Sequence, residues 1–181
     1  MKLYVVRHGE TLENANDCLV GRINSSLTEN GLKQALELRK YFSDKKIDLI
    51  ISSPLDRCKQ TSQMISNNKI KIIYDDNLLG RDHGEFTGMN KKLINFEEYW
   101  NYNKNIQYKK AESITTLYNR VAALIKKLKV KYQDKTIVIV THSGIIRVLY
   151  YYFKGIPEDG IMGEITIKNC DVFEYNLGGK E

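Results

Sequence analysis

Two apolar runs that each end in a histidine constrain the fold of this chain more than any other feature. Leu3-Tyr4-Val5-Val6 is followed at once by Arg7-His8-Gly9, and the β-branched run 136–141 is followed by His142-Ser143-Gly144. Unbroken apolar runs of this length predict buried strands. Ligands of open α/β sheets bind beyond the carboxyl ends of such strands, so we expect both histidines at one crevice.

A third predicted strand ends close to an arginine. The run 47–52 leads into Ser53-Pro54-Leu55-Asp56-Arg57. Ser53 suits the N-cap of a helix and Pro54 suits its first position, which places Arg57 in the first helical turn. The three strand ends together present four candidate site residues, namely Arg7, His8, Arg57 and His142.

The remaining pattern predicts an α/β protein. Amphipathic helices are expected after Thr28 and after Ser113. Their alternation with the strands indicates a three-layer α/β/α fold with a mostly parallel central sheet. The strands themselves are predicted near 2–7, 47–52, 70–74 and 136–141.

Two further segments are less regular. The stretches 164–167 and 171–175 predict a hairpin near the end of the chain. The segment 91–110 mixes aromatic residues with lysine and asparagine and has poor periodicity. We expect it either to cover the ligand or to form a plain surface insertion.

Length and composition favour one domain over residues 1–181. The chain is 42% hydrophobic and contains no proline-rich or glycine-serine linker. Three cysteines without a CxxC pair are typical of reduced thiols, and no signal-peptide or bilayer-length segment is recognised, so we expect a cytoplasmic protein without a membrane partner. The net charge of +6 comes from dispersed lysines, which favours a solvated surface over nucleic-acid binding.

Four segments resemble the histidine phosphatase superfamily, which includes phosphoglycerate mutases and small bacterial phosphatases. They are LYVVRHGETLEN (3–14), LTENGLKQA (27–35), IISSPLDRCKQT (50–61) and IVIVTHSGIIR (137–147). The resemblance implies a phosphoglycerate mutase-like fold and a phosphomonoester hydrolase with a phosphohistidine intermediate on His8. It implies no metal and no cofactor. The expected partner is a small phosphorylated substrate, and the chain is expected to be a monomer or a homodimer.

The candidate residues suit this chemistry. A phosphate monoester is doubly charged near neutral pH, and the guanidinium groups of Arg7 and Arg57 match its oxygens as planar forks. Neutral His8 can attack phosphorus with one ring nitrogen if the other donates its proton to a fixed acceptor such as a backbone carbonyl. His142, at the start of a helix, would stabilise the transferred phosphoryl group.

The neighbouring motif residues have two interpretations each. Asn14 matches a phosphate-pocket position of the family, but asparagine in a loop also makes local turn bonds. Ser143 is likewise a substrate-binding candidate or a structural residue. Glu10 and Thr11 belong to the motif and are equally explained by capping or loop bracing.

The glutamate that usually serves as proton donor in this family is missing. In the pattern L-x-E-x-x-x-G the chain carries Gly80 at the glutamate position. We nominate Asp82 as the donor, because strand-like alternation would turn it to the same side as Gly80. Glu85 and Glu112 are the other candidates.

The missing acid keeps alternative functions open. A phosphate-binding pseudoenzyme or regulatory module would not need a proton donor, and a phosphoglycerate mutase-type phosphotransferase is a further alternative. A metal at His8, His83 and His142 with Asp82 is disfavoured, because the two arginines would repel a dication. The substrate stays open among a cobalamin-pathway phosphate, sugar phosphates and phosphorylated protein. Ala111-Glu112-Ser113 resembles an alpha-ribazole phosphatase motif, but it is equally explained as a helix start.

Overall fold

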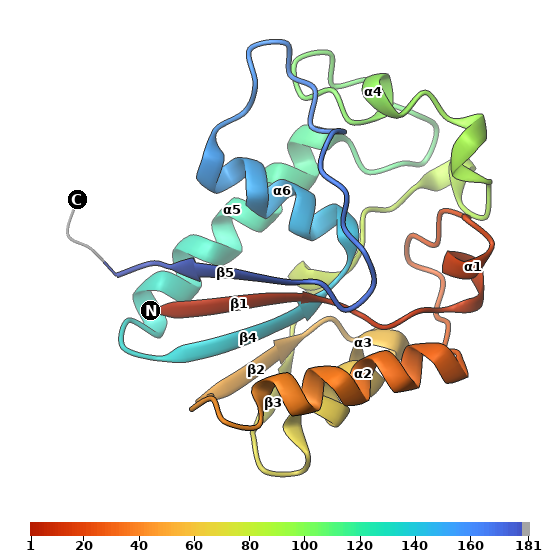
Figure 1. Ribbon diagram of the computed structural model, residues 1–181. Helices are drawn as coiled ribbons and strands as arrows, with labels where there is room; N and C mark the ends of the chain where they lie inside the picture. Colours follow the sequence, from red (N-terminus) through yellow and green to blue (C-terminus); the bar gives the residue numbers. More distant parts are fainter. Residues whose placement is uncertain (179–181) are drawn as a thin grey trace.

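A computed structural model describes residues 1–178, which form a five-stranded sheet in the order β3-β2-β4-β1-β5 (Figure 1). The first four strands are parallel, and β5 pairs antiparallel with β1 at one edge. The mostly parallel sheet is therefore confirmed. The strands are β1 (Lys2–Arg7), β2 (Leu49–Ser52), β3 (Ile72–Tyr74), β4 (Thr136–Thr141) and β5 (Val172–Asn176).

Helices cover both faces of this sheet (Figure 1). Leu3 and Val5 of β1 pack into a core with α5 and α6, whereas Tyr4 and Val6 pack into a second core with α2 and α3. Alternate residues of one strand thus enter two different cores, which explains its unbroken apolar sequence. The helices are α2 (Glu29–Phe42), α3 (Asp56–Ser66), α5 (Ile114–Lys131) and α6 (Ser143–Lys154).

The strand register aligns the residues that follow β1, β2 and β4. Arg7 lies opposite Thr141, and Ser52 lies opposite Val140. The ladder continues one step further, because the His8 amide donates to the Thr141 carbonyl at 3.0 Å. The residues that leave these three strands consequently meet at one edge of the sheet.

The predicted start of α3 was wrong, although the other two helix starts are confirmed. Thr28 and Ser113 cap α2 and α5 through their hydroxyls. By contrast, α3 begins at Asp56 after Leu55, which makes no side-chain cap. The Ser53 hydroxyl instead bonds His142 Nε2 at 2.9 Å, and Arg57 still lies in the first turn of the helix.

The predicted terminal hairpin was also wrong. Only its second half forms a strand, β5, and this strand pairs with β1. Residues 164–167 are irregular, and the Ile167 carbonyl accepts from Arg7 NH1 at 2.7 Å. This bond gives the buried guanidinium an acceptor, and the segment that provides it makes no ladder with β5.

The segment 91–110 forms a wall over the carboxyl edge of the sheet rather than a plain surface insertion. Its residues Tyr99 and Trp100 are buried, and the Met162 amide donates to the Trp100 carbonyl. Short helical turns dominate this region and the loops around it, namely α1 (Leu12–Ala15), η1 (Asp76–Leu78), η2 (Gly84–Phe86), η3 (Lys91–Leu93) and α4 (Phe96–Tyr99).

The loop after β1 lies directly on the first turn of α2. A Cβ built on Gly9 would lie 2.6 Å from the Gly31 carbonyl oxygen, and a Cβ on Gly31 would clash with the Glu10 carbonyl. The Thr28 amide also donates to the Glu10 carbonyl at 2.9 Å. Two glycines therefore permit the close approach that fixes the backbone next to His8.

We expect Gly31→Ala to lower both the stability and the activity of the protein. Alanine favours helix by about 1 kcal/mol over glycine, but its methyl group would push the loop off the helix, at a cost of about 1–3 kcal/mol. Urea denaturation measures the change, with the neighbouring exposed substitution Lys33→Ala as the control. Unchanged or increased stability of Gly31→Ala would contradict the close-packing argument.

Candidate active site

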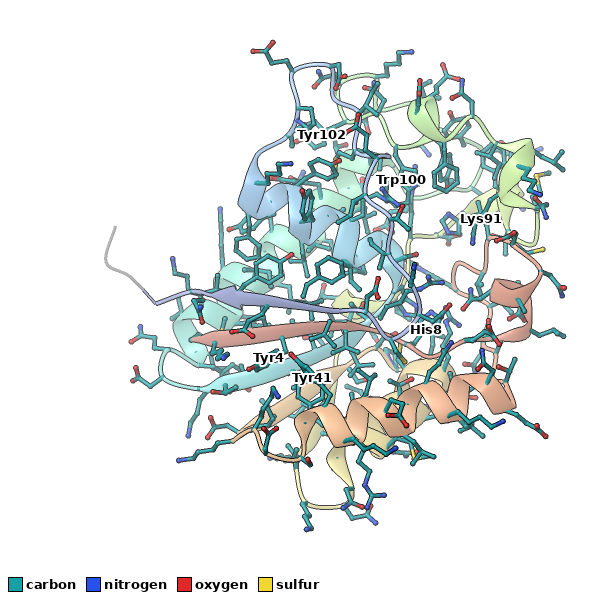
Figure 2. All side chains as sticks on the ribbon, viewed as in Figure 1. Tyr4, His8, Tyr41, Lys91, Trp100 and Tyr102 are labelled. Atoms are coloured by element: carbon teal, nitrogen blue, oxygen red, sulfur yellow. The ribbon has the colours of Figure 1, made fainter. Side chains whose placement is uncertain are left out.

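The four residues predicted from the strand ends line one cavity at the carboxyl edge of the sheet. The cavity has a volume of about 300 Å³. In Figure 2, His8 lies just beyond the end of β1, with Trp100 and Lys91 above it. Both of these residues also line the cavity. The predicted residues that converge there are Arg7, His8, Arg57 and His142.

Arg57 connects the two histidines. Its Nε donates to His8 Nε2 at 3.2 Å, and its NH2 lies 3.2 Å from His142 Nδ1. The same guanidinium also donates to the backbone carbonyls of Gly21 and Ile23, at 2.8 and 2.7 Å. These carbonyls hold the cation in place between imidazole rings whose centroids are 5.2 Å apart.

The contacts of Arg57 determine the tautomers of both rings. A guanidinium can only donate, so His8 Nε2 and His142 Nδ1 must be acceptors. The proton of His8 is therefore on Nδ1, which donates to the Gly9 carbonyl at 2.7 Å. The proton of His142 is on Nε2, which donates to the Ser53 hydroxyl. The lone pair of His8 Nε2 therefore points toward the Arg57 guanidinium.

Burial and neighbouring cations keep these imidazoles neutral. Burial is the largest cause that lowers the pKa of His8 well below 6.5, and the charges of Arg57 and Arg7 lower it further. Burial and Arg57 act in the same way on the pKa of His142. Arg7 stays charged at neutral pH, since burial lowers its pKa only to about 10. The site therefore combines two fixed cations with a neutral ring nitrogen.

Asn14 and Ser143 both line the cavity. Asn14 also makes the local bond that its alternative interpretation requires, because its Oδ1 accepts from the Thr11 amide at 3.3 Å. Asn169 Nδ2 donates both to Asn14 Oδ1 and to the His8 carbonyl, each at 3.0 Å. This residue was not identified from the sequence. Thr11 caps α1, which confirms its structural interpretation.

Glu10 has a bracing role. Its carboxylate accepts from the Thr28 hydroxyl at 2.8 Å and from the Asn30 amide at 3.1 Å. Both partners lie at the start of α2. Glu10 therefore ties the loop after β1 to this helix.

Asp82, our nominated proton donor, lies outside the cavity. Its Oδ1 accepts from the Gly84 amide at 3.0 Å, and its Oδ2 lies 3.9 Å from Arg22. The expected alternation does not hold, because Gly80, Arg81 and His83 line the cavity and Asp82 does not. This placement argues against Asp82 as the donor.

The other two candidate carboxylates are engaged elsewhere. Glu85 accepts from the Lys109 amide at 3.1 Å, and Glu112 pairs with Arg120 at 2.9 Å. Within residues 1–178, the cavity wall contains no carboxylate. Gly80 itself is at the site, since a Cβ there would lie 3.4 Å from His142 Cγ. The glutamate position of the family pattern is therefore next to the second histidine, but this chain has no acid there.

Several residues of the cavity were not identified from the sequence. Arg81 places its guanidinium carbon 4.0 Å from the Tyr99 ring centroid and 5.0 Å from that of Trp100. Arg147 lies 5.1 Å from the same Trp100 ring and donates to the Met162 carbonyl at 2.7 Å. Together with Lys91, these arginines make the cavity strongly cationic. Arg147 lies inside a matched motif, whereas nothing in the sequence indicates the role of Arg81.

His83 is the third histidine of the cavity wall. Its Nδ1 lies 2.6 Å from the Tyr99 hydroxyl. Burial lowers its pKa to about 3, so the ring is neutral. In the described part of the chain, no group of three or more His, Cys, Asp or Glu residues is arranged to hold a metal ion. No described helix is both long and apolar enough to cross a bilayer.

Comparison with known proteins gives consistent matches over nearly the whole chain. The model of the histidine phosphatase superfamily (branch 1) matches residues 3–181. Phosphoserine phosphatase 1 of Hydrogenobacter thermophilus is 29% identical, and the match covers 98% of this chain and 85% of that protein. The uncharacterized phosphatase PhoE of Bacillus subtilis is 32% identical over 83% of this chain and 76% of that protein.

Solved structures show the same fold. Phosphoserine phosphatase of Entamoeba histolytica, in complex with 3-phosphoglyceric acid, superposes with a TM-score of 0.85 at 25% identity, covering 96% of this chain and 89% of that one. The alpha-ribazole phosphatase of Shigella flexneri superposes with a TM-score of 0.80 at 23% identity, with the same two coverages. The predicted three-layer fold is thereby confirmed.

We expect the buried neutral histidines to make the folded protein less stable in acid. The pKa of His83 is about 3 in the folded protein, against about 6.5 in the unfolded chain, so the unfolded chain binds more protons between these values. The stabilisation is complete above about pH 6.5 and is lost as the pH falls toward 3, at up to about 1.4 kcal/mol per pH unit. Urea denaturation between about pH 6 and pH 4 should give a shallower pH dependence for His83→Gln than for the wild type. Parallel curves would contradict this account.

Proposed function

The chain belongs to the histidine phosphatase superfamily, and from this premise we propose that it hydrolyses phosphate monoesters through a phosphohistidine intermediate on His8. The observation that carries the proposal is the tautomer of His8. Its Nδ1 proton is held by the Gly9 carbonyl, and its Nε2 lone pair faces Arg57. A neutral imidazole held in this way is a competent nucleophile.

The two arginines provide the phosphate site. A phosphate dianion between Arg7 and Arg57 would accept the hydrogen bonds that Arg57 now donates to the two histidines. This exchange would free the lone pair of His8 Nε2. Arg7 Nε has no described acceptor within hydrogen-bond distance, so it is available to a ligand. Both guanidiniums would then neutralise the equatorial oxygens of the transferred group.

His142 would act on the same phosphoryl group from the other side. It occupies the N-cap of α6, where free backbone amides favour an anion. Once the phosphate replaces His142 as the acceptor for Arg57, His142 Nδ1 can take up a proton from solvent and donate it in a hydrogen bond to an equatorial oxygen. The bond from Nε2 to Ser53 fixes the ring in the orientation that this requires.

The second half of the reaction is attack of water on phosphohistidine. This step returns the nitrogen lone pair to His8 and releases inorganic phosphate. The relatives include phosphatases, such as phosphoserine phosphatase 1 and PhoE, and also the probable phosphoglycerate mutase GpmB of Escherichia coli. The phosphatases among them support the hydrolysis proposed here. The absence of a carboxylate from the described cavity wall is the one observation that favours a phosphate-binding module without turnover.

The cationic wall supports a substrate with a second anionic group. Two guanidiniums suffice for the phosphate, which leaves Lys91, Arg81 and Arg147 around the rest of the cavity. Arg81 NH2 is buried and has no described acceptor. A carboxylate would satisfy these donors, and a volume of about 300 Å³ suits a small molecule. The proposed substrate class is therefore small phosphorylated hydroxy or amino acids, such as phosphoserine.

We expect the wild type to hydrolyse phosphoserine without added metal and in the presence of EDTA. His8→Ala removes the nucleophile and should reduce turnover to background. Rapid acid-free quenching should trap labelled phosphate on the wild type at His8, as read by mass spectrometry. Tight binding of phosphate without turnover in the wild type would support the binding module instead.

We expect Lys91→Gln to raise KM for phosphoserine about tenfold or more, because a charge-assisted bond to the carboxylate is worth about 1.5–3 kcal/mol. The KM for propyl phosphate, which has no carboxylate, should stay within about twofold. Lys92→Gln is the matched control, because Lys92 lies in the same turn but does not line the cavity. Equal changes for both substrates would contradict a carboxylate subsite at Lys91.

A further inference from the structure

The cavity lacks the group that should protonate the leaving oxygen. Hydrolysis of an alkyl phosphate produces an alkoxide unless an acid supplies a proton as the bond to phosphorus breaks. None of the three nominated carboxylates lines the cavity, and Gly80 occupies the position of the usual acid. If the proposed function holds, another proton carrier must be present in the wall.

We propose that His83 and Tyr99 form a proton relay that replaces the missing carboxylate. This inference rests on the proposed phosphatase activity. In this relay, His83 is the catalytic residue that touches the leaving oxygen. Tyr99 acts through His83 as the source of the proton.

His83 is placed beside the phosphate clamp. Its ring packs on Gly21, because a Cβ there would lie 3.1 Å from His83 Cδ2. The Gly21 carbonyl is also the one that accepts from Arg57 at 2.8 Å. His83 lines the cavity and keeps 8% exposure, and no described protein group bonds its Nε2. That nitrogen is therefore free to meet a ligand.

Tyr99 fixes the proton on that free nitrogen. It is 1% exposed and does not line the cavity, and its hydroxyl reaches the site through His83. Among the described residues, His83 Nδ1 is the only acceptor bonded to its hydroxyl. A buried phenol must give its hydrogen to an acceptor, so Nδ1 accepts and the ring proton of neutral His83 is on Nε2.

Arg81 supplies the charge that such a relay needs. Its guanidinium carbon lies 4.0 Å from the centroid of the Tyr99 ring. Burial raises the pKa of Tyr99 to about 12, and the positive charge of Arg81 acts in the opposite direction. A transient phenolate at Tyr99 would therefore lie against a fixed cation.

The relay balances over both steps. As His8 Nε2 bonds phosphorus and the ester bond breaks, His83 Nε2 gives its proton to the leaving oxygen, and Tyr99 passes its own proton to His83 Nδ1. The product alcohol leaves with a Tyr99 phenolate behind it. In the second step, His83 Nε2 takes a proton from the attacking water as the phosphorus–nitrogen bond breaks. His83 Nδ1 then returns its proton to Tyr99.

The experiment compares leaving groups. For Tyr99→Phe, kcat/KM for phosphoserine, whose alkoxide needs a proton, should fall by about 100-fold or more. For p-nitrophenyl phosphate, whose phenolate leaves without one, kcat/KM should fall less than about threefold. This ratio follows because kcat/KM reports the step in which the alcohol is released. His83→Gln should give the same split between the two substrates.

Tyr108→Phe is the matched control. Tyr108 belongs to the same aromatic cluster, with its ring centroid 5.4 Å from that of Tyr99, but it makes no bond to His83. Its kcat/KM should match the wild type for both substrates. If circular dichroism shows that Tyr99→Phe does not fold, the test is the difference in kcat/KM loss between the two substrates for His83→Gln.

The outcomes separate the two proposals. A wild type without turnover overturns the proposed function and the relay together. If the wild type turns over, the relay alone is overturned when Tyr99→Phe and His83→Gln keep the wild-type kcat/KM, or when their kcat/KM falls equally for both substrates. Equal loss would indicate that the pair only shapes the cavity. A selective loss for phosphoserine in both variants supports the relay.

Discussion

The guanidinium of Arg57 is the interaction on which the site depends. It is held by two backbone carbonyls and donates to one nitrogen each of His8 and His142. This arrangement fixes both tautomers before any ligand binds, and burial together with the charge of Arg57 lowers the pKa of both rings and keeps them neutral. A bound phosphate needs only to replace the imidazoles as the acceptor, so the site is preorganised for an anion.

The contacts of the side chains that follow Arg57 explain the sequence motif around it. Cys58 is buried and lies 3.6 Å from His142 Nε2. Gln60 accepts from the Leu27 amide, and Thr61 accepts from the Gly9 amide at 3.1 Å. One helix turn therefore positions the cation, the second histidine and the loop that carries the first. The spacing reflects packing around a shared site as much as direct chemistry.

The charge distribution separates two tasks within one cavity. Arg7 ends β1 and Arg57 lies in the first turn of α3, and both side chains are buried. Arg81, Lys91 and Arg147 come from irregular segments and from the middle of α6. In the proposed function, the first group binds the phosphate common to all substrates, and the second contacts the part that differs between substrates.

The sequence by itself determined the four parallel strands and the groups at their ends, whereas only the tertiary structure decided the place of β5 and the rest of the cavity wall. A strand buried on both faces has a local signature, so the placement of His8 and His142 follows from the pattern. The direction of Asp82 and His83 does not, because it is set when their segment pairs with residues 109–112 and His83 bridges to Ala111. The irregular segment 164–167 likewise contacts a buried arginine distant in sequence, because the Ile167 carbonyl accepts from Arg7. Long-range hydrogen bonds of this kind leave no periodicity in the chain, and for that reason the other residues of the cavity wall emerged only from the folded structure.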